Sequence, residues 1–262
     1  MNVLLVFIGL VVPTLAAPEK RIVNGQAASL FEHPHQVSLQ AYSAPYGWYH
    51  TCGGVLIAVD KVLTAAHCVD KSQARNLRVI VGALNLNSPN EYTQTLGVAS
   101  YVMHELYNAN GNGYPNDIAV IYLQTPATLN RNVQLASLAP KGSSFADTTC
   151  VITGWGRTSG TGSTSTILLE AHITKITREA CHAIWSQYGV SITAKHICVY
   201  EESGSSGSRP SSCMGDSGGP MMCGRNYEYR LVTSWGASSC SGDFPSVYTR
   251  VSEYVDWVNA HL

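Results

Sequence analysis

Short runs of β-branched and aromatic residues recur along the chain, separated by turn-forming residues. They lie at 36–40, 55–58, 77–82, 117–123, 150–153, 229–234 and 246–251. Strands at such spacing predict an all-β fold built from barrels or a sandwich. Helical spacing of apolar residues is clear only at the end of the chain, where it predicts a helix over about 252–262, and a weaker pattern predicts a second helix over 178–187.

The first twelve residues form an almost wholly apolar run that is too short to span a membrane. Small residues follow at Ala16 and Ala17, which resembles a signal-peptidase site and predicts a signal peptide over 1–16. A buried N-terminal strand is the alternative interpretation, but nothing in the run alternates with polar residues. The sequence therefore predicts a secreted, extracellular product.

The eight cysteines are even in number and suit an oxidising compartment. A zinc site is the alternative use, but the chain contains no Cys-x-x-Cys or paired Cys/His spacing. Residues 1–21 contain two of the 16 basic and one of the 17 acidic side chains, so 14 basic and 16 acidic remain after their removal. This balance argues against nucleic acid as a partner. The sequence contains no second long apolar run of the kind that would attach the chain to a membrane.

One serine lies in a turn rich in glycine. Ser217 is flanked by Gly215, Gly218 and Gly219 in the segment Cys-Met-Gly-Asp-Ser-Gly-Gly-Pro. Glycine permits a sharp turn whose backbone N–H groups point one way, so the amides of Gly215 and Ser217 are candidates for an oxyanion hole. A merely flexible turn is the alternative interpretation of this segment alone.

Two further segments supply the other groups that a serine nucleophile needs. His67 follows the apolar run Leu-Thr-Ala-Ala and precedes Cys68, and Asp117 opens the run Ile-Ala-Val-Ile-Tyr-Leu. An unpaired carboxylate at the start of an apolar strand would be costly, so Asp117 needs a partner. Taken singly, a histidine or aspartate in such a place is more often structural than catalytic.

The three segments occur in the chain order His, Asp, Ser, and further motifs accompany them at 22–25 (Ile-Val-Asn-Gly), 52–54 (Cys-Gly-Gly), 153–156 (Thr-Gly-Trp-Gly) and 234–236 (Ser-Trp-Gly). Together they resemble the trypsin/chymotrypsin family of serine proteases over the whole chain after residue 21. The resemblance implies two antiparallel six-stranded β-barrels packed face to face, over about 35–130 and 131–250, with the active site in the cleft between them.

The resemblance also implies roles for individual residues. His67 would take the proton of Ser217 as general base, and Asp117 would orient the imidazole. Ser234 matches the family serine that hydrogen-bonds this aspartate. The backbone of 234–236, which includes Trp235 and Gly236, would bind the substrate as an added strand.

Activation by cleavage is a further implication. Arg21 and Ile22 match the family's activation site, so residues 17–21 would be a propeptide that a trypsin-like protease removes. The new ammonium group at Ile22 would then pair with Asp216. Ser38 and His50 match positions that hold this aspartate before cleavage in chymotrypsin-like precursors.

All eight cysteines match family positions, which implies the disulfides Cys52–Cys68, Cys150–Cys223, Cys181–Cys198 and Cys213–Cys240. The resemblance implies no cofactor and no metal site, because Ala83 stands where calcium-binding members carry glutamate. Expected partners are protein and peptide substrates, the activating protease and protein inhibitors. We expect a monomer.

Specificity depends on three pocket positions that the resemblance assigns to Ser211, Gly236 and Ser246. Ser211 stands at the pocket base, where trypsin-like members carry aspartate, so cleavage is expected after Leu, Phe, Tyr or Met. Asp243 is expected to lie at the surface. The segment 48–54, preceded by a long loop over 41–47, resembles pancreatic elastases. A protease specific for basic residues and a catalytically inactive binding module are the alternatives.

Overall fold

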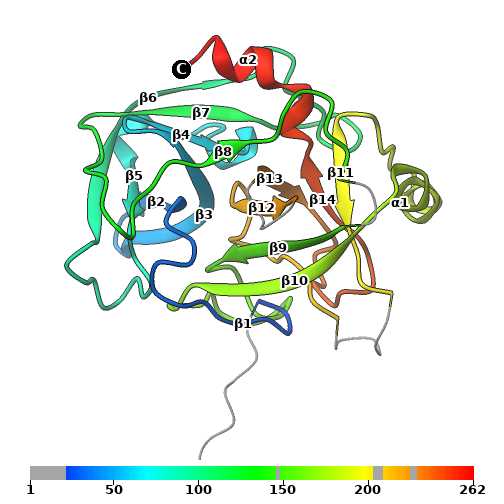
Figure 1. Cartoon of the computed structure of the whole chain (residues 1–262), viewed down its shortest axis with the longest axis horizontal. Helices are drawn as coiled ribbons and strands as arrows, with labels where there is room; N and C mark the ends of the chain where they lie inside the picture. Colours follow the sequence, from blue (N-terminus) through cyan, green and yellow to red (C-terminus); the bar gives the residue numbers. More distant parts are fainter. Residues whose placement is uncertain (1–21, 146–147, 203–208, 225–228) are drawn as a thin grey trace, which may run out of the picture.

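The computed structural model describes residues 22–145, 148–202, 209–224 and 229–262 (Figure 1). The signal peptide expected over 1–16 and the propeptide expected over 17–21, including Arg21, lie outside these residues. The fold is mostly β, as the strand pattern predicts. No helix in the described ranges is long and apolar enough to cross a membrane.

The first half of the chain forms a closed six-stranded barrel with strand order β2-β3-β4-β7-β6-β5. Its strands are β2 (Gln36–Ser43), β3 (Gly47–Ala58), β4 (Lys61–Thr64), β5 (Leu77–Val81), β6 (Gln94–Met103) and β7 (Ala119–Leu123). Side chains such as Val55, Leu63, Val79 and Ile121 fill the interior and are fully buried. The loop expected over 41–47 is instead a continuation of the β2–β3 hairpin, since Ser43 pairs with Gly47.

The second half, together with one short strand from near the start of the chain, forms an eight-stranded sheet. Its strands are β1 (Gln26–Ala27), β8 (Ser137–Leu138), β9 (Thr149–Gly154), β10 (Leu169–Ile176), β11 (His196–Val199), β12 (Pro220–Cys223), β13 (Tyr229–Trp235) and β14 (Ser246–Thr249). Pairing of β9 with β10 closes six of these strands into a ring, which we call the second barrel. One pairing departs from the expected antiparallel pattern, because the short β8 runs parallel to β13.

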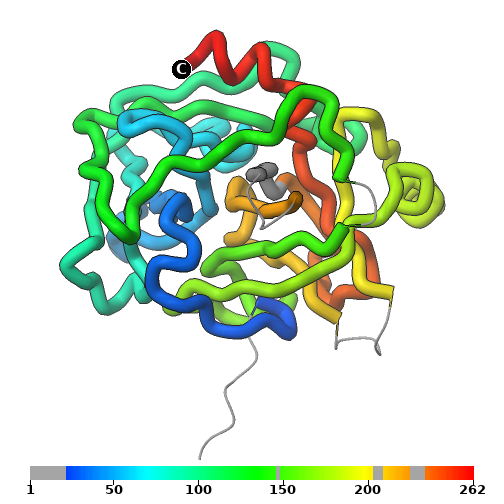
Figure 2. Tube along the Cα trace, viewed as in Figure 1, coloured from blue at the N-terminus to red at the C-terminus, as the bar shows by residue number. Residues whose placement is uncertain are grey.

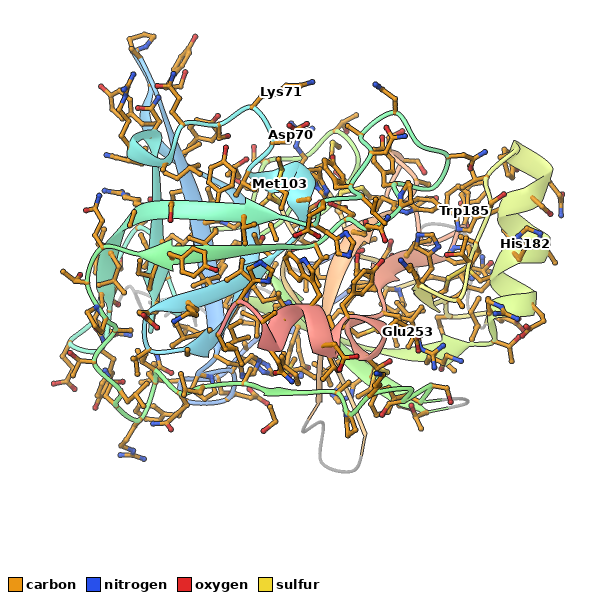
Figure 3. All side chains as sticks on the ribbon, turned by 90° about the horizontal axis from the view of Figure 1, so that it is seen from above. Asp70, Lys71, Met103, His182, Trp185 and Glu253 are labelled. Atoms are coloured by element: carbon orange, nitrogen blue, oxygen red, sulfur yellow. A yellow bond between two sulfur atoms is a disulfide. The ribbon has the colours of Figure 1, made fainter. Side chains whose placement is uncertain are left out.

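Two α-helices accompany the barrels in the part of the chain that the structure describes. Helix α1 (Arg178–Trp185) confirms the weaker helix prediction and is capped by Thr177, whose hydroxyl accepts a hydrogen bond from the Ala180 amide. Trp185 packs against Trp235 with ring centroids 4.8 Å apart, and Figure 3 shows it on the side of α1 that faces the rest of the molecule.

The terminal helix is shorter than the sequence pattern predicts. Helix α2 covers only Val255–Asn259 and follows a separate turn of 3-10 helix at Val251–Glu253. Tyr254, between them, has φ −120° and ψ 11°, which is not helical. The Tyr254 hydroxyl and Asn116 share a buried hydrogen bond of 3.1 Å, so the end of the chain is fixed to the segment before β7.

The structure contains the four disulfides that the family resemblance implies. Cys52–Cys68 joins β3 to the short turn that carries His67, and Cys213–Cys240 joins the Ser217 turn to the segment after β13. Cross-links at these places limit the movement of both segments.

Candidate active site

His67 and Asp117 lie together where β4 and β7 run side by side. The Asp117 carboxylate accepts hydrogen bonds from the His67 backbone N–H (2.9 Å) and from His67 Nδ1 (2.7 Å). The hydroxyl of Ser234 on β13 donates a third bond of 2.5 Å. Asp117 is only 1% exposed, and these three donors compensate its burial. A carboxylate only accepts, so the proton of the neutral imidazole resides on Nδ1 and Nε2 remains an acceptor.

Ser217 lies in a tight turn before β12. The Asp216 amide donates to the Cys213 carbonyl, the Gly219 amide to the Asp216 carbonyl, and the Gly53 amide of β3 to the Ser217 carbonyl at 2.7 Å. Gly215 has φ +100°, a conformation that only glycine adopts without strain. The turn is therefore fixed both internally and by the first barrel.

A cavity of about 440 Å³ between the two barrels brings these groups together. His67 lines its first-barrel side, with Asp70, Tyr107 and Tyr114. The second barrel contributes Ser217 and the segments 212–214 and 234–238. The cavity lining therefore includes Ser234, Trp235 and Gly236, the residues that the family resemblance assigns to substrate binding. The cavity thus brings together His67 and Ser217, a base and a hydroxyl of the kinds that nucleophilic attack by serine requires.

Asp216 is buried beside Ser217 and accepts hydrogen bonds from the amides of Gly156 (2.8 Å) and Cys213 (2.9 Å). Burial raises its pKa to about 6, although these two bonds act in the opposite direction. No lysine or arginine within the described ranges forms an ion pair with it. A side chain at position 154 or 156 would overlap the carboxylate, which explains the glycines of the Thr-Gly-Trp-Gly motif.

Ser38 and His50 form a hydrogen-bonded pair that contacts the Ser217 turn. His50 Nε2 donates to the Gly215 carbonyl at 2.9 Å, so its Nδ1 accepts the Ser38 hydroxyl at 2.8 Å. Burial lowers the pKa of His50 to about 4, so the ring is neutral at physiological pH. In this structure the pair therefore holds the residue before Asp216 and not its carboxylate.

The hydroxyls of Ser211 and Ser246 lie 3.2 Å apart and are both buried behind the cavity. Ser211 also donates to the Ser212 carbonyl, and Ser246 accepts from the Ser212 amide. Gly236 forms the facing wall, where a Cβ would lie 3.8 Å from the Ser246 Cα. Ser212, rather than Ser211 or Ser246, lines the cavity itself.

Asp243, expected at the surface, is partly exposed and has a basic partner that the sequence does not indicate. Its side chain is 31% exposed and forms an ion pair with Arg209 at 3.4 Å. Arg209 follows a polar, glycine-rich stretch in the sequence, so no local pattern connects the two residues. The pairing leaves Asp243 with a positive partner of its own.

The family model described as Trypsin matches residues 22–258, nearly all of the chain that follows the expected propeptide. The chain belongs to the trypsin family. It is 43% identical to "Fibrinolytic enzyme, isozyme C" of Lumbricus rubellus, covering 90% of this chain and 98% of the relative. It is 40% identical to "Chymotrypsin-like elastase family member 1" of Bos taurus, with coverage of 98% and 97%. A "Chymotrypsin-like serine proteinase" of Haliotis rufescens is 38% identical, with coverage of 93% and 92%.

The protein is thus a chymotrypsin-like serine endopeptidase. Several residues that line the cavity of this endopeptidase belong to no motif in the sequence. Tyr107 and Tyr114 approach from the segment before Asp117, and the Tyr107 hydroxyl is buried without a hydrogen-bond partner. The only sequence signal was the presence of aromatic residues in a turn-rich stretch between β6 and β7.

The pH dependence of the endopeptidase should follow His67. Burial disfavours the charged imidazole, but the hydrogen bond and charge of Asp117 outweigh it and raise the pKa of His67 above its ordinary value. A general base must be neutral, so kcat/KM is expected to rise with pH through a midpoint above about 6.5, the ordinary value. Initial rates from pH 5 to 9 test this, and a midpoint below 6 would contradict the role of Asp117.

Proposed function

We propose that this endopeptidase is secreted as an inactive precursor, is activated by cleavage after Arg21, and cuts proteins after Leu, Phe, Tyr or Met. The observation that carries the specificity is the neutral pair behind the cavity, where the buried hydroxyls of Ser211 and Ser246 lie within hydrogen-bonding distance of each other. The four disulfides and the apolar leader support secretion.

The geometry supports a two-step acyl transfer. His67 Nε2 takes the proton of Ser217 Oγ as this oxygen attacks the carbonyl carbon of the scissile bond, and then gives the proton to the leaving amine. In the second step, water attacks the acyl-enzyme in the same way and releases the carboxylic acid product. Asp117 stays ionised throughout and stabilises the imidazolium through the 2.7 Å bond to Nδ1. The amides of Gly215 and Ser217 would stabilise the oxyanion.

Burial of Asp216 supports the activation step. The carboxylate is 2% exposed and lacks a cationic side-chain partner in the described part of the chain. The Ile22 side chain is already buried in the core, and Val23 bridges to Ser211. Cleavage after Arg21 would create an ammonium group at Ile22, and pairing it with Asp216 would offset the cost of the buried charge.

The cavity's second-barrel end argues for an apolar substrate side chain. Its described lining residues there are uncharged: Ser212, Cys213, Met214, Ser217, Ser234, Trp235, Gly236, Ala237, Ser238 and Cys240. Asp243, the nearest acidic candidate for binding a basic side chain, is already paired with Arg209. A lysine or arginine side chain would lose its hydration there without gaining a counter-charge.

The test is a panel of peptides that differ only in the residue before the cut. We expect kcat/KM for Leu, Phe, Tyr and Met to exceed that for Lys and Arg by about 10²-fold or more, since an unpaired buried charge costs several kcal/mol. Ser211→Asp should narrow this ratio by supplying a carboxylate. A preference of the unaltered enzyme for Lys or Arg would instead support the alternative, a protease specific for basic residues.

A further inference from the structure

A cluster of side chains that could bind a metal lies beside strand β10 of the second barrel, where the segment after Ile22 runs along this strand (Figure 2). None of its members is among the catalytic groups described above. Strand β1 places Gln26 opposite Glu170 of β10. The same segment then brings Glu32 and His33 to Glu170, although 137 residues separate His33 from Glu170 in the sequence. Spacing along the chain gives no sign of this juxtaposition.

One ligand atom from each of Glu32, His33 and Glu170 lies within 4.8 Å of the others. His33 Nε2 and Glu170 Oε2 are 2.6 Å apart, and the side chains of His33 and Glu170 are only 7% and 5% exposed. Glu32 is exposed. The cluster therefore has two buried members and one at the surface, which leaves a route from solvent.

The two carboxylates are held in place by their neighbours. Glu170 Oε1 accepts the Gln26 side-chain amide at 2.7 Å, and Glu32 Oε2 accepts the Ser29 backbone amide at 2.8 Å. No lysine or arginine of the described ranges forms an ion pair with either carboxylate. Two negative groups thus converge on one imidazole, an arrangement that a divalent cation would neutralise.

We propose that Glu32, His33 and Glu170 bind one Zn²⁺ ion, with water as the fourth ligand. One imidazole nitrogen and two carboxylate oxygens suit zinc, whereas Ca²⁺ and Mg²⁺ prefer oxygen ligands alone and in larger number. Tetrahedral zinc at about 2.0–2.1 Å from each ligand separates two ligand atoms by roughly 3.3 Å. The His33–Glu170 pair must therefore open by about 0.7 Å, and any proton on His33 Nε2 passes to solvent.

The metal would join the segment that follows Ile22 to the second barrel. Binding to the folded chain alone stabilises that chain by mass action, so zinc at about 100 times its Kd should raise the Tm by about 5 °C or more. This effect requires no change in the catalytic groups and does not depend on the proposed specificity or activation.

Isothermal titration of the folded protein with ZnCl₂ tests the site, with Ser217 blocked by a fluorophosphonate to occupy the active-site cavity. One zinc per chain is expected. Glu32→Gln should weaken binding at least about tenfold without affecting folding, because Glu32 is exposed. His33→Gln should abolish it. His172→Gln is the matched control, since His172 is an exposed histidine on the same strand, and should bind as the unaltered protein does.

X-ray absorption at the zinc edge should show a single imidazole among nitrogen and oxygen ligands. Absence of binding, binding that Glu32→Gln and His33→Gln leave unchanged, or a shell of two or more imidazoles would overturn the proposal.

Discussion

Replacing Asp117 with asparagine is expected to lower kcat about 10⁴-fold with little change in KM. The Asp117 carboxylate accepts bonds from the His67 backbone, from His67 Nδ1 and from Ser234. An amide at this position would turn its NH₂ group toward at least one of these donors. The imidazole would then favour the tautomer with the proton on Nε2, which cannot accept the proton of Ser217.

Steady-state kinetics on a Leu or Phe peptide at pH 8 measure this effect. Asp256→Asn is the control, because Asp256 is 77% exposed in a surface ion pair with Lys141 and lies outside the catalytic groups. That variant should retain full activity. A loss smaller than about tenfold in Asp117→Asn, with the fold intact, would show that the orientation of His67 does not depend on Asp117.

Replacing Arg21 with alanine is expected to leave the precursor uncut and at least about 10²–10³-fold less active than the cleaved enzyme. Without a new ammonium group at Ile22, the buried Asp216 carboxylate lacks the ion-pair partner proposed for it. The amide of Gly215, the residue before Asp216, would then be displaced from the oxyanion hole, and loss of one such donor costs this much in turnover.

The same argument gives the uncut chain a characteristic stability profile. Burial raises the pKa of Asp216 from its ordinary value to about 6, so between about pH 4 and 6 the folded chain binds more protons than the unfolded one. This group therefore makes the precursor less stable as pH rises through that range. Cleavage after Arg21 should reduce this loss of stability with rising pH. The control is Arg21→Lys, which a trypsin-like protease still cuts and which should therefore behave as the cleaved enzyme does.

The sequence predicted those parts of the fold in which apolar residues lie next to one another along the chain. Each of the seven predicted strand runs overlaps a strand, but the strands β1, β4, β6, β8, β10, β11 and β12 were not predicted. Strand β10 carries the buried charged residues Glu170 and Lys175, and Glu170 finds its partners Gln26 and His33 in a distant segment, so hydrophobicity alone does not identify this strand. The terminal helix was predicted too long because Tyr254 leaves helical geometry to reach Asn116.

The candidate site likewise has residues that local motifs predict and contacts that only the folded chain reveals. Short motifs marked His67, Asp117 and Ser217, because each needs a particular local backbone. The partner of His50 is the Gly215 carbonyl, and that choice depends on how the two barrels meet. The Arg209–Asp243 pair and the cluster at Glu170 also join residues far apart in sequence, and a single sequence contains no signal for such contacts.

Active-site labelling tests most directly the claim that Ser217 becomes a nucleophile when the chain is cut after Arg21. The Arg21→Ala precursor and the cleaved enzyme would be treated with a fluorophosphonate, digested and mapped by mass spectrometry. We predict one label per cleaved chain, on Ser217, and at least about 10²-fold slower labelling of the precursor. Equal rates in the two forms would contradict the activation step, and a label on another residue would contradict the assignment of Ser217.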